Sequence, residues 1–204
     1  MLSTFALGYV AVARLLKGNV DASHAVPAWL IPGVATLDIP VTGAHMPMAW
    51  APEVNLMAVA TGTVLAVVLF SMIISRLVHR DPLAPDATPS LMILVAPFAV
   101  GFLGYSNLVG GIDRFATLLF YFSLFMFAVV APKIFRPSVT FSPAWWAISF
   151  PMAAMVNAAL KYAEFQASWP HWVIAVGLLG FVSVALVVLT VRTAMSLRDG
   201  TLFQ

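Results

Sequence analysis

The tract Ser142-Pro143-Ala144-Trp145-Trp146-Ala147-Ile148-Ser149-Phe150-Pro151-Met152 contains two prolines eight residues apart within an uncharged, mainly apolar run. A serine followed by proline is typical of a helix start, because the hydroxyl can cap the first turn and proline suits the first helical position. The second proline lacks a backbone N–H and displaces the carbonyl four residues earlier. The tract therefore predicts a helix that begins near Ser142 and is broken near Pro151.

The same pattern occurs twice more in the chain. Thr88-Pro89 is followed eight residues later by Pro97, and Val26-Pro27-Ala28-Trp29-Leu30 opens like the quoted tract and is followed by Pro32 and Pro40. The intervals between the three starting prolines are 62 and 54 residues, about one helical hairpin each. This spacing predicts a repeat in which a proline-broken helix is followed by a smooth one.

Composition places these helices in a membrane. Of 204 residues, 62% are hydrophobic and 9% are charged, whereas a soluble domain carries about 25% charged residues. Too few charged side chains are present to cover a water-facing surface, so the sequence predicts an integral membrane protein. Five uncharged stretches of 18 to 27 residues can each cross a hydrocarbon core of about 30 Å as a helix: 54–75, 87–112, 115–132, 137–160 and 165–191.

These patterns together predict an all-α bundle of about seven helices in a single transmembrane domain over 1–204. The broken helices belong inside the bundle, because non-helical backbone at membrane depth must pack against protein or line a wet cavity. The smooth helices, rich in Leu, Val and Phe, suit a lipid-facing ring. The expected helices are about 1–16, 28–44, 54–78, 88–108, 114–132, 142–162 and 171–193, with a tail at 194–204.

Basic residues are distributed unequally between the two sides of the predicted bundle. If the loops alternate sides, only Arg114 and Lys161 fall on one side and the other eight fall on the opposite side. Cytoplasmic loops carry an excess of Lys and Arg. The sequence therefore predicts a multi-pass protein of the cell membrane with a cytoplasmic C-terminus and tail, and with the N-terminus, as given, outside. The eight are Arg14, Lys17, Arg76, Arg80, Lys133, Arg136, Arg192 and Arg198.

Residue usage disfavours several classes of function. The net charge of +2 comes from residues scattered through loops, so there is no basic face for nucleic acid. A chain without cysteine cannot form disulfides, thiolate metal sites or iron–sulfur clusters. The four histidines fall in loops or at helix ends, which disfavours a haem or metal site. We therefore expect neither an enzyme nor a resident cofactor or metal.

Only one carboxylate falls near the middle of a predicted span. Asp38 lies near the middle of its span and close to Pro40, and an intramembrane carboxylate is a candidate cation site or proton relay. Alternatively, Asp38 lies in an outer vestibule or pairs with Lys161 near the outer end of the helix at 142–162.

The prolines within the broken helices allow two interpretations. The kinks shape helix packing, or they line a pathway through the bundle. Their recurrence in equivalent helices favours the pathway, in which backbone carbonyls released by proline need other partners. Gly101 and Gly104 favour close helix packing over flexibility. The candidate kinks are Pro32, Pro40, Pro97 and Pro151, and the released carbonyls belong to Ala28, Thr36, Ile93 and Ala147.

Three tracts, in this order, resemble the family of slow anion channels, TehA-like tellurite-resistance proteins and dicarboxylate (malate) transporters. The resemblance covers essentially the whole chain. It implies a ten-helix protein of five hairpins, in which five proline-kinked inner helices surround a central anion pore. Family members have both termini in the cytoplasm and usually form homotrimers. The tracts are Pro27-Ala-Trp-Leu-Ile-Pro32, Pro89-Ser-Leu-Met-Ile-Leu-Val-Ala-Pro-Phe-Ala-Val-Gly101 and Ala144-Trp-Trp-Ala-Ile-Ser-Phe-Pro-Met152.

The resemblance also assigns a role to Phe150. In the family a phenylalanine on the last inner helix plugs the pore, and Phe150 in Ser149-Phe150-Pro151 matches it. A residue just before proline is displaced from ideal helical geometry, which suits a ring directed off the helix wall, and an apolar constriction blocks ions by dewetting. Judged by residue type alone, Phe150 is one of 15 phenylalanines and would simply pack.

The chain matches helices four to ten of the family, so two inner pore helices are not represented. We expect an N-terminally incomplete family member that conducts only when another segment completes the pore. The predicted function is transport of small anions, such as chloride, nitrate, malate, sulfite or tellurite, by a channel or exporter gated by Phe150. The alternatives are a proton- or cation-coupled carrier of organic acids that uses Asp38, and a non-conducting truncated remnant.

Overall fold

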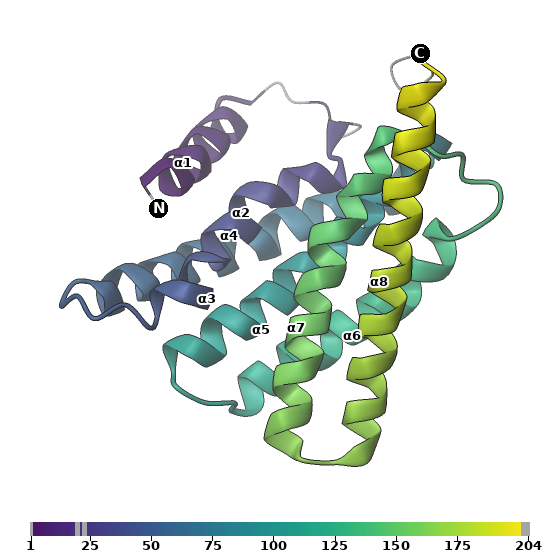
Figure 1. The fold of residues 1–204 in the computed structure, drawn as a ribbon. Coiled ribbons are helices and arrows are strands. Elements are labelled where there is room, and N and C mark those ends of the chain that lie inside the picture. The colour runs from purple at the N-terminus through teal and green to yellow at the C-terminus, as the bar shows by residue number, and fades with distance from the viewer. Residues whose placement is uncertain (1, 19–20, 22–23, 201–204) are drawn as a thin grey trace.

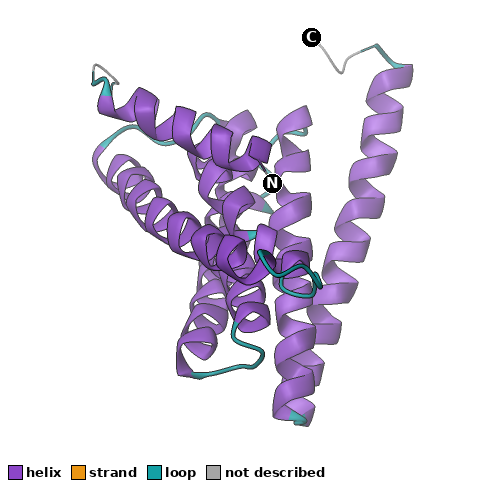
Figure 2. Ribbon diagram, turned by 90° about the vertical axis from the view of Figure 1, so that its left-hand side faces the viewer, coloured by secondary structure: helices purple, strands orange, loops and turns teal. Residues whose placement is uncertain are grey.

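A computed structural model describes residues 2–18, 21 and 24–200, and the regular secondary structure of this part of the chain is all helical, without strands (Figures 1 and 2). Counted with each broken helix taken once, it contains the seven helices that the sequence predicts, and the expected all-α architecture is confirmed. The elements are α1 (Leu2–Leu16), η2 (Pro27–Leu30), α2 (Ile31–Leu37), α3 (Ile39–Gly43), α4 (Ala51–His79), η3 (Pro85–Val95), α5 (Ala96–Leu108), α6 (Arg114–Ile134), η4 (Pro143–Ile148), α7 (Ser149–Gln166) and α8 (Trp169–Arg198).

Each broken helix starts as a 3-10 helix and becomes α-helical at a proline. Pro32, Pro97 and Pro151 lie in the first turns of α2, α5 and α7, directly after η2, η3 and η4. The first turn of an α-helix needs no N–H from proline, so the ring is tolerated there. Pro40 occupies the same position in α3, which follows α2 after the single residue Asp38. The sequence predicted the break points but not the 3-10 segments.

The tighter 3-10 turns bind backbone carbonyls that we expected to need other partners. The carbonyl oxygens of Ala28 and Ile93 accept the backbone N–H groups of Ile31 and Ala96, three residues later. A 3-10 helix has this i to i+3 pattern. The expectation was therefore wrong for these two carbonyls, which are bonded within the broken helix itself.

Several helix ends differ from their predicted positions. The second broken helix, expected to begin at 88, begins at Pro85. The Thr88 hydroxyl lies inside η3, where it donates to the carbonyl of Ala84 (3.2 Å). Helix α8 continues to Arg198, so residues 194–198 of the expected tail are helical. Residues 201–204 of the expected tail lie outside the described residues.

The smooth helices lie at the periphery and the broken ones inside. Four segments are long and apolar enough to cross a membrane: α4, η3 with α5, α6 and α8. In the most apolar window of each, 61% of residues are buried in the η3–α5 segment, against 28%, 28% and 17% in α4, α6 and α8. Figure 2 shows α8, which leads to the C-terminus, at the edge of the bundle. These fractions match the expected lipid-facing ring.

Aromatic rings join the central helix α5 to its neighbours. Phe120 of α6 stacks on Tyr162 of α7 with ring centroids 4.2 Å apart, and Phe102 of α5 lies 5.7 Å from Phe120. One turn earlier on the same side of α5, Phe98 meets Phe122 of α6 edge-to-face at 4.4 Å. Such pairs add about 0.5–1.5 kcal/mol each beyond burial. These ring contacts therefore join α5 to α6 over two successive turns.

Glycines allow the broken helix α2–α3 to lie close to α4 and α5. A Cβ on Gly62 of α4 would lie 2.9 Å from the backbone nitrogen of Leu37, and one on Gly104 of α5 would lie 2.6 Å from its carbonyl oxygen. A Cβ on Gly101 would instead meet only side-chain atoms, at 3.7 Å and beyond. The expected close packing is thus found at Gly104, while Gly101 makes ordinary contacts.

Candidate functional site

The three broken helices share a cavity of about 390 Å³. Ile31 of α2, Ala96 of α5 and Phe150 of α7 line it, and each directly precedes the proline at which its helix becomes α-helical. The repeat therefore brings equivalent positions of three helices to one place. The other lining residues are Val34, Ala35, Asp38, Ile93, Trp146, Ala147 and Pro151.

Helix register, not distortion, directs the side chains into the cavity. We expected a residue before proline to leave helical geometry, but the equivalents of Phe150 do not: Ile31 has φ −53° and ψ −45°, and Ala96 has φ −55° and ψ −47°. Both are right-handed helical values. The ring of Phe150 is 48% exposed, so it is not packed into the protein core of the described chain.

The predicted kink prolines themselves contribute little to the cavity wall. Pro151 lines it, whereas Pro32, Pro40 and Pro97 do not, and Pro40 and Pro97 are buried. The prolines set where the helix changes its pitch, and the preceding residue forms the wall. Ile31 and Ala96 were not singled out from sequence, although their place before a repeat proline is the same as that of Phe150.

Asp38 lies on the same cavity as Phe150. It is the residue between α2 and α3, its side chain is exposed, and it is the one charged residue among those that line the cavity. Its backbone N–H donates to the Val34 carbonyl (3.0 Å), and its own carbonyl accepts from Val41 (3.1 Å). The helix break thus holds a carboxylate beside an apolar ring, a proximity that sequence reasoning did not find.

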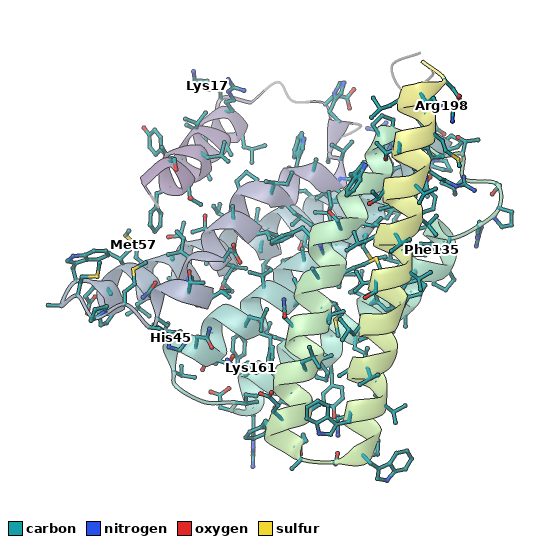
Figure 3. All side chains as sticks on the ribbon, in the orientation of Figure 1. Lys17, His45, Met57, Phe135, Lys161 and Arg198 are labelled. Atoms are coloured by element: carbon teal, nitrogen blue, oxygen red, sulfur yellow. The ribbon has the colours of Figure 1, made fainter. Side chains whose placement is uncertain are left out.

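Lys161 has partners other than Asp38. Its Nζ donates to Ser106 Oγ (2.8 Å) and to Asn107 Oδ1, both on α5, and Asn107 Nδ2 donates to the Val41 carbonyl (2.6 Å) at α3. The suggested pairing of Asp38 with Lys161 is therefore wrong. Lys161 instead links α7 through α5 to α3, at the end of the bundle opposite Lys17 and Arg198 (Figure 3).

One face of α7 continues from the cavity towards Lys161. Phe150, Ala153, Asn157 and Glu164 are exposed and Lys161 is half-buried, at spacings that place all five on one side of the helix. The stripe changes from apolar at the cavity to polar beyond it. The α2–α3 segment has a similar exposed series, formed by Ile31, Asp38, Thr42 and His45.

The wall chemistry of the cavity is apolar apart from one carboxylate. Hydrocarbon, aromatic and proline groups form most of the surface. Within residues 2–18, 21 and 24–200, no group of three His, Asp or Glu side chains could hold a metal ion. The arrangement suits passage or exclusion of a solute more than bond chemistry, because catalysis by proton transfer needs a positioned acid or base next to the reacting group.

The fold and site define the class of this protein: a polytopic helical membrane protein with a cavity lined by repeated, proline-broken helices. The family model of the voltage-dependent anion channels (SLAC1) matches residues 1–194. The chain belongs to this family, as the resemblance indicated.

Curated relatives from Arabidopsis thaliana match part of the chain. S-type anion channel SLAH1 is 32% identical over 120 residues, or 57% of this chain and 31% of the relative. S-type anion channel SLAH2 is 30% identical over 145 residues, which cover 69% of this chain and 28% of the relative. Guard cell S-type anion channel SLAC1 is 29% identical over 138 residues, which cover 67% of this chain and 25% of the relative. The matched region thus spans about a quarter to a third of each relative's length.

Proposed function

We propose that this chain contributes to a transmembrane pathway for small anions, with Phe150 as its gate. The observation that carries the proposal is the position of Phe150 on a cavity where the same position of three repeated helices converges. Membership of an anion channel family supports the anion as the solute. Chloride, nitrate, malate, sulfite and tellurite are the candidate anions.

The gate acts by excluding water. Ile31, Ala96 and Phe150 form an apolar ring segment around the cavity, and a narrow apolar constriction blocks ions because it does not stay wet. The aromatic ring is the largest of the three side chains and lacks close protein packing. Movement of this ring out of the cavity would open the route without changing the backbone of α7.

In this proposal, selectivity for anions comes from weak electrostatic fields in the cavity and not from fixed cationic side chains. Among the cavity-lining residues, no lysine or arginine is present, and the first α-helical N–H of α5 is already bonded to Ile93. Anions would therefore encounter few fixed donors at the constriction and pass without tight binding, as conduction requires. Lys161 and Asn157 on the same face of α7 provide polar groups farther along the route.

A second candidate function is proton-linked transport of organic acids. Asp38 beside Phe150 supports it, because an intramembrane carboxylate on a transport route can carry a proton. The two candidates differ in what happens when the charge is removed. A passive pathway gains anion flux when Asp38 is neutralised, whereas a proton-linked carrier loses transport driven by a pH gradient.

The remaining architecture is proposed from the family resemblance and the charge distribution. The protein would lie in the cell membrane with a cytoplasmic C-terminus, and the family assembly is a homotrimer. This chain supplies three of the five inner helices that the family resemblance implies around a complete pore, so two further inner helices would have to complete it.

Anion flux from liposomes tests the gate. The protein in its full-length context, with and without Phe150→Ala, is reconstituted, and chloride and nitrate release is measured. We expect at least a several-fold rise in basal flux, because the substitution removes the apolar plug and adds no charge. Phe125→Ala is the matched control, since Phe125 is an exposed phenylalanine of α6 away from the cavity. Unchanged flux at equal protein content, or an equal rise in both variants, would contradict the gate assignment.

A further inference from the structure

A second cavity of about 390 Å³ lies at the periphery of the bundle, between the end of α6, the loop after it, η4 and α8. Its walls are mainly aromatic and branched aliphatic side chains. Helix α8 contributes a stripe at helical spacing, and three members of the stripe are well exposed: Phe181 (40%), Val184 (64%) and Val188 (47%). The cavity therefore opens on the helix that is the least buried of the four candidate spans.

Two arginines lie on this cavity at one end. Arg192 is one helical turn beyond Val188 on α8, with its guanidinium carbon 5.9 Å from the centre of the Phe141 ring, and Arg136 follows α6. Arg136 Nε donates to the Pro132 carbonyl (3.3 Å), which orients the guanidinium. Within the part of the chain that the structure describes, no carboxylate forms an ion pair with either arginine. Their positive charge is thus available to an external anion.

The length of the cavity along α8 matches half the thickness of a bilayer's hydrocarbon core. Phe181 and Arg192 are eleven positions apart on α8, which corresponds to about 16 Å along a helix axis. Half of a typical hydrocarbon core is about 15 Å thick. A molecule whose charged group reaches the arginines can therefore place its apolar part along the stripe down to Phe181.

We propose that this cavity binds an anionic phospholipid of the leaflet at the basic end of the bundle. The phosphate-bearing headgroup would lie between Arg136 and Arg192, and one acyl chain would lie along Phe181, Val184 and Val188. Basic pockets at helix ends recognise anionic headgroups in this way. The proposal does not depend on the gate or on the solute of the pathway.

The combination of the two surfaces favours a lipid over other occupants. A free phosphate or other small anion would gain from the arginines but not from the apolar wall. A second copy of the chain would cover the apolar wall but would bring a like charge to the arginines unless an acidic patch accompanied it. An anionic phospholipid complements both surfaces at the observed spacing.

Thermal unfolding in detergent provides the first test. The purified chain is heated with added phosphatidylglycerol, phosphatidylcholine or soluble glycerol 3-phosphate. A ligand that binds only the folded state raises the unfolding midpoint, so we expect an increase of several degrees with phosphatidylglycerol and a clearly smaller one with the other two. Equal shifts with both lipids would overturn the proposal, and an equal shift with glycerol 3-phosphate would indicate a free-phosphate site instead.

Arginine variants locate the effect. The double substitution Arg136→Gln and Arg192→Gln should abolish the difference between the two lipids. Arg198→Gln is the matched control, because Arg198 is exposed at the same end of α8 but does not line the cavity. If Arg198→Gln abolishes the difference between the two lipids to the same degree, the lipid is attracted nonspecifically by positive charge, and the proposed site is wrong.

A cavity-filling variant tests the acyl-chain position. Val188→Trp should remove the preference for phosphatidylglycerol, whereas Val187→Trp should keep it, because Val187 is equally part of α8 but faces away from the cavity. If Val188→Trp instead changes only the oligomeric state, measured by light scattering, and leaves the lipid preference intact, the face is an interface between copies and the lipid assignment is wrong.

Discussion

Gly104 of α5 lies directly against the carbonyl of Leu37, so that a Cβ at position 104 would be 2.6 Å from that oxygen. No real Cβ contact is that short, and backbone on both sides leaves little room to adjust. The α2–α3 segment, which carries Asp38 to the cavity, is therefore held in place by the absence of a side chain on α5.

Gly104→Ala should destabilise the fold by about 1–3 kcal/mol, which is the usual cost of overpacking. The measurement is the unfolding midpoint in detergent. Gly101→Ala, three residues earlier on the same helix, is the control and should be neutral or slightly stabilising, because its Cβ meets only side chains at 3.7 Å and beyond. Equal stability of the two variants would show that α3 can move away from α5 at little cost.

Replacing Lys161 should weaken the junction of α3, α5 and α7. Lys161→Met removes the donor to Ser106 and Asn107, and unsatisfied partners of this kind cost about 1–3 kcal/mol. We expect a lower unfolding midpoint, measured as for the glycine variants. Lys133→Met, at an exposed site on α6, should leave the midpoint nearly unchanged, and a similar loss in both would refute the role of the junction.

Asp113, at the start of α6, should make the stability of the folded protein depend on pH. Its carboxylate accepts the Ala116 N–H (2.8 Å) and then the Tyr105 hydroxyl (2.7 Å), and these bonds lower its pKa below the ordinary value. A lowered pKa in the folded state contributes stability above the unfolded-state pKa, and that stability is lost as the pH falls through the folded-state pKa.

The measurement is the unfolding midpoint of the wild type and of Asp113→Ala from neutral pH down to about pH 2, below the ordinary carboxyl pKa of about 3.9. The wild type should be more stable at neutral pH, and the difference should shrink as the pH falls. A difference that stays constant over this range would mean that the carboxylate charge is not what caps the helix.

Asp38→Asn should distinguish the two candidate functions. In a passive pathway the substitution removes a negative charge beside Phe150 and should raise anion flux without any dependence on a pH gradient. In a proton-linked carrier, uptake driven by the gradient should fall to background. Flux of chloride and of malate, measured with and without an imposed pH gradient, separates these outcomes, with Glu164→Gln as a control carboxylate farther along α7.

The predicted orientation, with a cytoplasmic C-terminus, rests on the eight-to-two distribution of basic residues. A reporter enzyme that is active only in the cytoplasm, fused after Gln204, should be active. The same reporter placed in the short connection between α5 and α6, at Gly110, should be inactive. The reverse pattern would exchange the two sides assigned to Lys161 and to the basic end.

The sequence predicts the helices well because their signals are local. Charge gaps mark the spans, and prolines eight residues apart mark the breaks at Pro97 and Pro151. The 3-10 geometry before each break is not predictable from this pattern, since a proline is accepted in the first turn after either kind of helix. Only the hydrogen-bond pattern, such as the bond from the Ala96 N–H to the Ile93 carbonyl, distinguishes a 3-10 helix from an α-helix before the proline.

The candidate site is less accessible from sequence because it depends on helix rotation and tilt. Lys161 and Asn107 are 54 residues apart, and nothing in their local sequence indicates that they meet. Asp38, which the sequence singled out as unusual, lies on the cavity, but its suggested partner was wrong. Ile31 could have been found, because it occupies the same place before a repeat proline as Phe150.

The 3-10 segments also determine how far the inner helices extend. A 3-10 helix rises about 2.0 Å per residue and an α-helix about 1.5 Å. The 24 residues from Pro85 to Leu108 include eleven in η3, so this segment is about 5 Å longer than an all-α helix of equal residue count. It therefore nearly equals the length of the 29-residue α4. A short inner helix can in this way match the thickness of the bilayer set by its longer neighbours, and a return of η3 to α-helical geometry would withdraw one of its ends from the membrane surface by about one helical turn.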